Sequence, residues 1–152
     1  MWGSMHDEWK QTFDALPDML ALIDTNHRII RVNKAMAICL NMTPEKCVGQ
    51  PCYRLMHGKD AIPDQCPHSM LLKDESSHVV EVSERHLNME LQITVSPLFD
   101  EKGALIGCVH VARDITDSRK IENILKKSER CLHSITNNMM DLVTVLDLKG
   151  NI

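Results

Sequence analysis

The sequence predicts an α+β domain with an antiparallel sheet and short helices on one face of that sheet. Three observations lead to this expectation. Two apolar runs of strand length lie near the start of the chain, and three more follow residue 78. Short segments with helix signals lie between the two groups. After residue 114 the apolar spacing becomes that of a helix.

The composition is that of an ordinary globular protein, with 43% hydrophobic and 25% charged residues among 152. This length supports one domain with a buried core. The net charge of -4 argues against a nucleic-acid partner, and no apolar run approaches the ~20 residues of a membrane span. The polar N-terminus does not resemble a signal peptide. We therefore expect a cytoplasmic protein whose six scattered cysteines are reduced thiols.

The first expected element is a short amphipathic helix over 6–16. Trp9, Phe13 and Leu16 recur at i, i+4 and i+7, which places them on one helical stripe. Pro17 ends this helix. Met1 to Ser4 precede a second Met, and we set them aside as tag-like residues.

A hairpin and a group of short helices are expected next. Apolar runs at 19–23 and 29–32 flank the turn-forming residues 24–27. Asn33 is expected to cap a helix that runs to about Leu40.

Further helix signals follow, separated by an irregular segment. Thr43-Pro44-Glu45 opens a helix that Gly49 closes. The Gly- and Pro-rich residues 49–67 predict irregular structure, and 69–73 a short helix.

Three antiparallel strands are expected in the second half, at 79–83, 87–96 and 105–112. Residues 87–96 alternate apolar and polar side chains without a break, which is typical of a half-buried strand. Asp100-Glu101-Lys102-Gly103 predicts the hairpin loop before the last strand.

The last element is a helix of about 23 residues with Asp114 as its expected N-cap. Its apolar positions follow the 4-3-4 spacing of a coiled-coil seam. The spacing predicts either a homodimer through this helix or a helix that packs on its own domain. We expect the N-terminal helix to take part in the dimer. The seam positions are Ile121, Leu125, Ser128, Leu132, Ile135 and Met139.

The end of the chain repeats its beginning, because residues 140–152 align with 17–29 at a constant offset of 123. A repeat of this size corresponds to a whole domain. We expect 140–152 to contain the first strand of a second copy, not folded as it would be in an intact array. The expected boundaries are an N-terminal helix with tag-like residues at 1–12, a domain at 13–117, a connecting helix at 118–138 and a truncated second domain at 139–152.

Four strings in this order resemble a PAS domain, the sensory module that occurs in tandem in histidine kinases. They are LPDMLALIDTNHRIIRVNKA, VGQPCYRLMH, ITVSPLFDEKGALIGCVHVARDITD and RKIENILKKSE. The second resembles the middle helical segment of the family, and the third ends in its Asp-Ile-Thr signature. The resemblance covers about residues 13–130, and the tail resembles the next PAS copy.

The resemblance implies a five-stranded sheet curled around a ligand cavity, followed by a signalling helix. Signal transfer would run through Asp114, Ile115 and Thr116 into that helix. The implied function is a non-catalytic sensor of a two-component phosphorelay, which binds a small-molecule ligand and acts on a downstream PAS or kinase domain.

A metal site is one candidate chemistry. Cys52, His57, Cys66 and His68 supply two thiols and two imidazoles within 17 residues, a donor set that zinc accepts. Some PAS relatives resemble this string but carry a further cysteine where this chain has Pro63, which puts the family role in doubt. The alternative is that these are loop thiols and surface histidines.

Haem and flavin are weaker candidates. The resemblance implies a haem-ligating histidine near His68 or His78, without a haem-specific signature. Cys39 and Cys47 do not lie in the string that surrounds the reactive cysteine of flavin-binding relatives.

The closing strand provides two candidate ligand contacts, Cys108 and His110, on one face with Ile106 and Ala112. Periodicity defines two faces and leaves open which of them is buried. No catalytic motif is recognisable, and His133 lacks the neighbours of a phosphoacceptor histidine because Ser134 follows it. Three hypotheses follow: a ligand sensor, a metal- or redox-responsive version, and a ligand-free module that dimerises and relays signals.

Overall fold

The computed structural model describes residues 4–148, and the side chains of residues 4–139. Its contacts divide the chain into two units, with the boundary between Ile115 and Thr116. Within the described range, no helix is both long enough and apolar enough to cross a bilayer.

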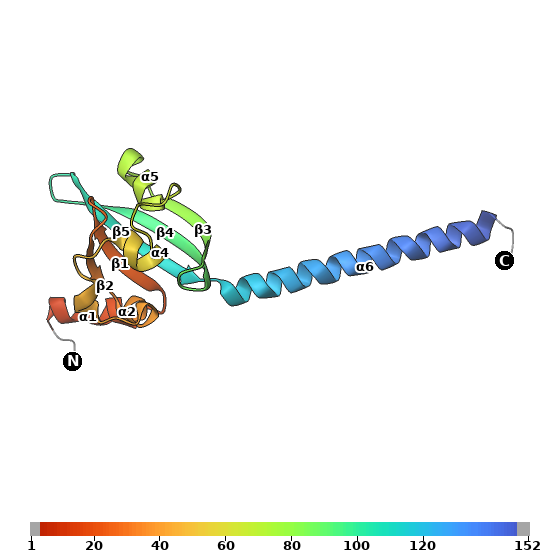
Figure 1. Ribbon diagram of the computed structural model, residues 1–152, viewed down its shortest axis with the longest axis horizontal. Helices are drawn as coiled ribbons and strands as arrows, with labels where there is room; N and C mark the ends of the chain where they lie inside the picture. Colours follow the sequence, from red (N-terminus) through yellow and green to blue (C-terminus); the bar gives the residue numbers. More distant parts are fainter. Residues whose placement is uncertain (1–3, 149–152) are drawn as a thin grey trace. The chain divides into compact units, whose positions relative to one another are not determined.

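The first unit is built on a five-stranded antiparallel sheet with the order β2-β1-β5-β4-β3 (Figure 1). The strands are β1 (Met19–Asp24), β2 (Ile29–Val32), β3 (His78–Glu84), β4 (Met89–Phe99) and β5 (Leu105–Asp114). The first and last strands in the sequence pair in the middle of the sheet, with Ala21 opposite His110. This arrangement confirms the predicted fold and places the closing strand at the centre.

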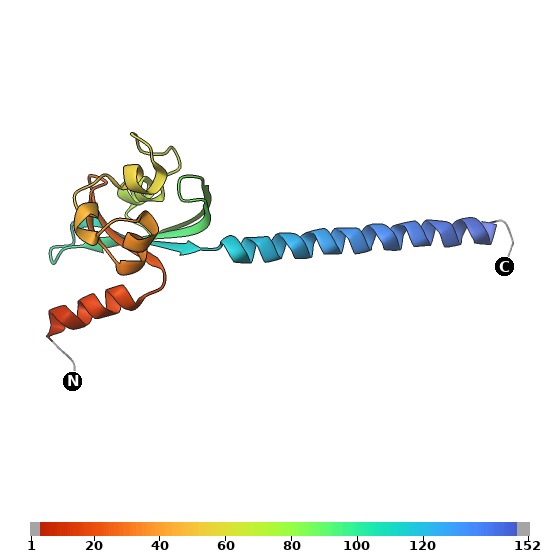
Figure 2. The ribbon, with the colours of Figure 1, turned by 60° about the horizontal axis from the view of Figure 1, so that its bottom comes forward.

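Short helices gather on one face of the sheet (Figure 2). They are α2 (Lys34–Leu40), α3 (Pro44–Cys47), α4 (Cys52–His57) and α5 (Pro67–Asp74). The separate helix α1 (Met5–Ala15) stacks Trp9 on Phe13, and the Arg31 guanidinium of β2 lies 5.0 Å from the centre of the Trp9 ring. The stripe expected on α1 therefore contacts the first hairpin.

Helix α4 lies inside the segment that composition predicts to be irregular, so that prediction is wrong over these six residues. Pro51 precedes the helix, and Gly58 ends it in the left-handed region at φ 61°. The Gly58 N–H donates to the carbonyl oxygen of Arg54 at 3.0 Å. Glycine and proline here mark the two ends of a helix, which agrees with the PAS resemblance of this string.

The core lies between the helices and the inner face of the sheet. The alternation predicted for β4 is confirmed, because Leu91, Ile93 and Val95 are all buried. Gly107 lets β5 approach β1 closely, since a Cβ at this position would collide with the backbone carbonyl of Ile23. Ile106 is exposed because the β4–β5 register shifts there and leaves it opposite no β4 residue.

The second unit is helix α6, which runs from Thr116 to Leu148. It extends beyond the connecting helix expected at 118–138. Residues 142–146, expected to start a second copy, are helical because a lone strand has no partner for its backbone groups. Residues 149–152 of the repeat lie outside the described residues. The assignment of 139–152 to a second domain stays a prediction.

Candidate functional site

Asn33 forms the centre of a buried network at the start of the sheet. Its side chain is completely buried, and it caps α2 as expected, because its Oδ1 accepts a hydrogen bond from the Met36 N–H at 3.0 Å. The same oxygen accepts from the Leu20 N–H at 3.0 Å. Backbone pairing adds a bond from the Asn33 N–H to the Leu20 carbonyl. One side chain thus fixes β1 against the first turn of α2.

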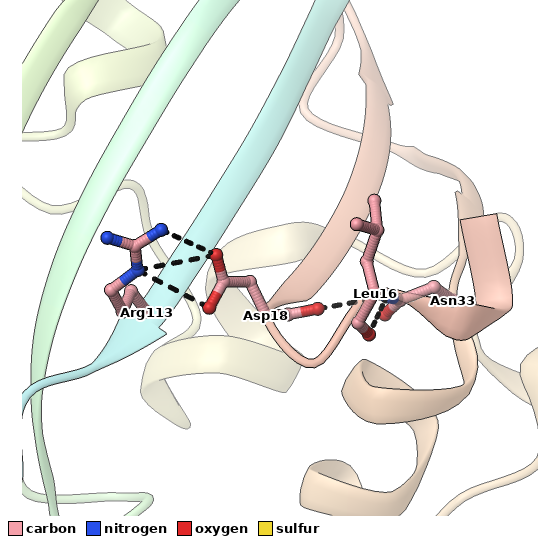
Figure 3. Close-up of polar contacts among 4 residues, drawn as sticks. All are labelled: Leu16, Asp18, Asn33 and Arg113. Atoms are coloured by element: carbon pink, nitrogen blue, oxygen red, sulfur yellow. Dashed lines mark hydrogen bonds and ion pairs between the residues drawn. The ribbon is translucent and has the colours of Figure 1, made fainter. Parts of the chain in front are cut away.

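The amide nitrogen of Asn33 holds the segment that leads from α1 into β1. It donates to the carbonyl oxygens of Phe13, Leu16 and Asp18 at 3.2, 3.4 and 2.9 Å, and Figure 3 draws the last two. The network therefore joins α1, β1 and α2.

Asp18 extends this network to the end of the closing strand (Figure 3). Its carboxylate pairs with Arg113, with 3.1 Å between Oδ2 and Nη2. Arg113 precedes Asp114, the last residue of β5. From the other side, the Ile115 N–H donates to the Glu90 carbonyl at 2.8 Å. The chain is thus held on two sides just before Thr116.

The predicted relay residues occupy this junction. Asp114 ends β5 and Thr116 begins α6, so Ile115 takes the flanking position in which Asp114 was expected as the N-cap. The difference arises because β5 keeps its pairing as far as Asp114 opposite Leu91.

The closing strand also lines an interior cluster of thiols and imidazoles. Cys108 is completely buried and His110 is 6% exposed, so the face carrying both candidate contacts is the inner one. Cys52, Cys66 and His68 are buried on the helical side. The sequence left the orientation of β5 open, and burial decides it.

Burial keeps Cys52, Cys108, His68 and His110 uncharged at neutral pH. It raises the pKa of the Cys52 and Cys108 thiols to about 12, chiefly because a thiolate would lose its hydration. Burial also lowers the pKa of His110 to about 4, and that of His68 below its ordinary value. These two thiols are therefore protonated and weakly nucleophilic, and the two imidazoles are neutral.

Two imidazole nitrogens in the cluster are buried without a hydrogen-bond partner among the described residues. We call His68 Nδ1 and His110 Nδ1 the open nitrogens. His68 Nε2 lies 2.9 Å from the Asp24 carbonyl oxygen, and the His27 ring meets the His68 ring edge-on at 4.6 Å. Sequence reasoning missed His27 because it lies in a polar turn far from the cysteines in sequence.

The four predicted metal ligands do not form one coordination shell. His57 pairs with Glu84 of β3, while His68 bonds to the Asp24 backbone. Among residues 4–139, no group of three or more His, Cys, Asp or Glu side chains is arranged to hold a metal ion. The alternative of surface histidines is wrong for His68, which is buried, and the alternative of loop thiols is wrong for Cys52, which begins α4.

The residues considered for haem and flavin, His78, Cys39 and Cys47, also lie in separate parts of the domain. His78 bonds to Asp74 at 2.9 Å at the edge of the sheet. The Cys39 Sγ lies 4.0 Å from the Met89 Sδ, and Cys47 is buried in the core.

Comparison with known proteins agrees with this architecture. The family model described as the PAS fold matches residues 13–120. No curated protein sequence gives a significant match.

Several solved structures share the fold. A PAS domain from Colwellia psychrerythraea is 19% identical over 75% of this chain and 99% of that chain, with a TM-score of 0.61. The PAS domain of nitrogen regulation protein NR(II) from Vibrio parahaemolyticus is 15% identical over 74% and 100%, with a TM-score of 0.58. The PAS domain of BvgS from Bordetella pertussis is 16% identical over 80% and 93%, with a TM-score of 0.54.

The family match covers both the sheet with its helices and the Asp-Ile-Thr junction. The chain therefore belongs to the PAS family, whose members are sensory and signalling modules.

Proposed function

We propose that this chain is a ligand-responsive sensor which relays a conformational change through its exit helix to a downstream domain. The downstream domain is a further PAS copy or a protein histidine kinase of a cytoplasmic two-component phosphorelay, and this chain itself is not catalytic. The PAS family and the repeat at 140–152 support the tandem arrangement.

The strand β5 is the observation that favours a relay. It carries His110 in the interior and ends at Asp114, so four residues, or roughly 14 Å of strand, separate the cluster from the junction. A strand paired on both sides moves as a unit with its neighbours. A change around His110 would therefore reach Arg113 and Ile115, where Asp18 and the Glu90 carbonyl respectively hold the chain.

Arg113→Ala tests the relay. Without the guanidinium the end of β5 loses its tie to Asp18, so we expect faster amide hydrogen exchange at Ile115 and in the first turn of α6. Exchange measured by NMR reports both positions. Arg54→Ala is the control, because it removes a comparable surface ion pair, with Asp60, from another part of the domain. Equal protection at Ile115 in wild type and Arg113→Ala would contradict the relay.

Homodimerisation through α6 is the second part of the proposal. The apolar seam residues Ile121, Leu125, Leu132, Ile135 and Met139 are 50–63% exposed. An apolar stripe at coiled-coil spacing, interrupted at Ser128, is suited to the same stripe of a second copy. The N-terminal helix would supply a separate contact between the two copies through the exposed part of Trp9.

A double substitution tests the seam. Leu125→Lys with Leu132→Lys places charges in the expected interface, so we expect the dimer to dissociate at least tenfold more readily in sedimentation equilibrium. Asn123→Lys with Ser134→Lys adds the same charges about 200° around the helix and is the matched control. A wild-type monomer at high micromolar concentration would refute the dimer.

The metal- or redox-responsive version and the ligand-free relay remain alternatives. The high thiol pKa values of Cys52 and Cys108 favour the ligand sensor over a redox sensor.

A further inference from the structure

The geometry around His68 defines which of its two nitrogens is a free acceptor. Its side chain is 1% exposed, and Nε2 lies 2.9 Å from the Asp24 carbonyl oxygen, which can only accept. Nε2 must therefore carry a proton. A neutral imidazole has one N–H, so Nδ1 presents a lone pair. This lone pair has no donor within the described part of the chain.

His110 provides the second open nitrogen from the opposite side of the interior. It lies on β5, whereas His68 lies on α5, and a charge on His68 would disfavour a charge on His110. His68 bonds to the Asp24 carbonyl, and Asp24 pairs with Gly107 of β5, three residues from His110, so both imidazoles lie against the same pair of central strands. Buried polar atoms are normally hydrogen-bonded, so two open nitrogens in one interior indicate a missing partner.

The chemistry of the surrounding groups selects the class of that partner. The Cys52 and Cys108 thiols resist deprotonation, and the His27 and His110 imidazoles resist protonation. The Asp24 carboxylate acts on this cluster, but its Oδ1 already accepts hydrogen bonds from the Asn26 and Arg28 N–H groups. The uncharged thiols and imidazoles offer an ionic ligand no countercharge of their own, so such a ligand would enter at a high desolvation cost. A neutral ligand that donates a hydrogen bond avoids this cost and satisfies the His68 lone pair.

We propose that the interior between α5 and β5 binds a small neutral molecule whose hydroxyl or N–H group donates to His68 Nδ1, with His110 as a second polar contact. The proposal rests on the ligand-sensor function above and names the ligand class of that sensor. A buried water molecule is the competing partner, and the experiment includes it as an outcome.

Phenol and toluene are the probes, because they have nearly the same size and differ by one hydrogen-bond donor. Their affinities are measured by NMR titration, and the imidazole nitrogens are followed in long-range proton–nitrogen spectra. One hydrogen bond to a buried acceptor corresponds to about tenfold in affinity, so we expect phenol to bind about tenfold more tightly. Phenol, and not toluene, should shift the His68 Nδ1 signal.

His68→Phe removes the acceptor and keeps a buried ring, so it should bring the phenol-to-toluene ratio to about one. His133→Phe, on the exposed part of α6, is the matched control and should leave the ratio unchanged. Because the wild-type ratio needs no variant, the proposal can fail even if His68→Phe does not fold.

Three results would overturn the inference. Equal affinities for phenol and toluene would show that the hydroxyl donor does not contribute to binding, although the interior would still bind a small molecule. A His68 Nδ1 signal already hydrogen-bonded to water and unmoved by phenol would identify water as the partner. If neither probe binds, the proposed ligand class is wrong. The relay is tested separately, by amide hydrogen exchange at Ile115.

Discussion

Asn33 and His68 are both almost completely buried, yet the polar atoms of Asn33 are all hydrogen-bonded and those of His68 are not. The Asn33 amide donates to three carbonyls and accepts from two N–H groups, all within the backbone around it. His68 uses one nitrogen on the Asp24 carbonyl and leaves the other open within the described residues. A satisfied buried group stabilises one arrangement of the chain, whereas an unsatisfied one provides a contact for something else.

Replacement of Asn33 should have the largest effect. Asn33→Ala leaves two N–H and three carbonyl groups with poorer partners, so we expect a loss of roughly 3–5 kcal/mol of unfolding free energy. Urea denaturation measures it. Asn137→Ala, exposed on α6, is the control and should change stability by less than about 0.5 kcal/mol. If Asn33→Ala lost less than about 1 kcal/mol of unfolding free energy, the satisfied Asn33 network would contribute little to stability. The contrast with His68 would then not hold.

Acid should destabilise the domain through His110. Its pKa in the folded protein, about 4, lies below the ordinary 6.5, so between these values the unfolded chain binds a proton that the folded one excludes. The unfolding free energy is then highest above pH 6.5 and falls by about 3 kcal/mol as the pH drops toward 4. The lowered pKa values of His27 and His68 act in the same direction.

His110→Phe isolates this contribution. Denaturation between pH 7 and pH 4 should be less pH-dependent in the variant, because the buried ring no longer titrates. His133→Phe should keep the wild-type dependence. A variant with the full wild-type loss would assign the acid sensitivity to other groups.

His68→Phe should change stability least. The substitution removes an open nitrogen and keeps a ring of similar size, while the Asp24 carbonyl loses its donor. These effects oppose each other, so we expect a loss of no more than about 1 kcal/mol. A loss as large as that of Asn33→Ala would mean that His68 is mainly structural. Urea denaturation of both variants in one buffer makes the comparison.

Structural features whose signals lie within a few neighbouring residues were predicted correctly from the sequence. The alternation over 87–96, the first hairpin and the Asn33 cap each depend on residues close in sequence. The segment at 49–67 was misjudged in part, because Pro51 and Gly58 end a helix as readily as they interrupt one. The tail over 139–148 is helical where its repeat at 16–25 contains a strand, because a strand needs a pairing partner and a helix does not, and its assignment to a second domain stays a prediction.

The candidate site was predictable only in its components. Cys52, Cys66, His68, Cys108 and His110 were all identified as candidates, but spacing grouped the first three with His57, which instead pairs with Glu84. The contribution of Asp24 is a backbone carbonyl, which no side-chain pattern reveals.

The sequence alone determined the order of the elements, the PAS resemblance and the seam of the exit helix, because periodicity and capping act over a few residues. Only the tertiary structure decided that β5 turns Cys108 and His110 inward, that Asp18 ties the first strand to Arg113, and that His68 has an open nitrogen. These features depend on strand pairing and burial between residues as much as 95 positions apart. Such contacts form when the sheet closes, so local sequence patterns do not specify them.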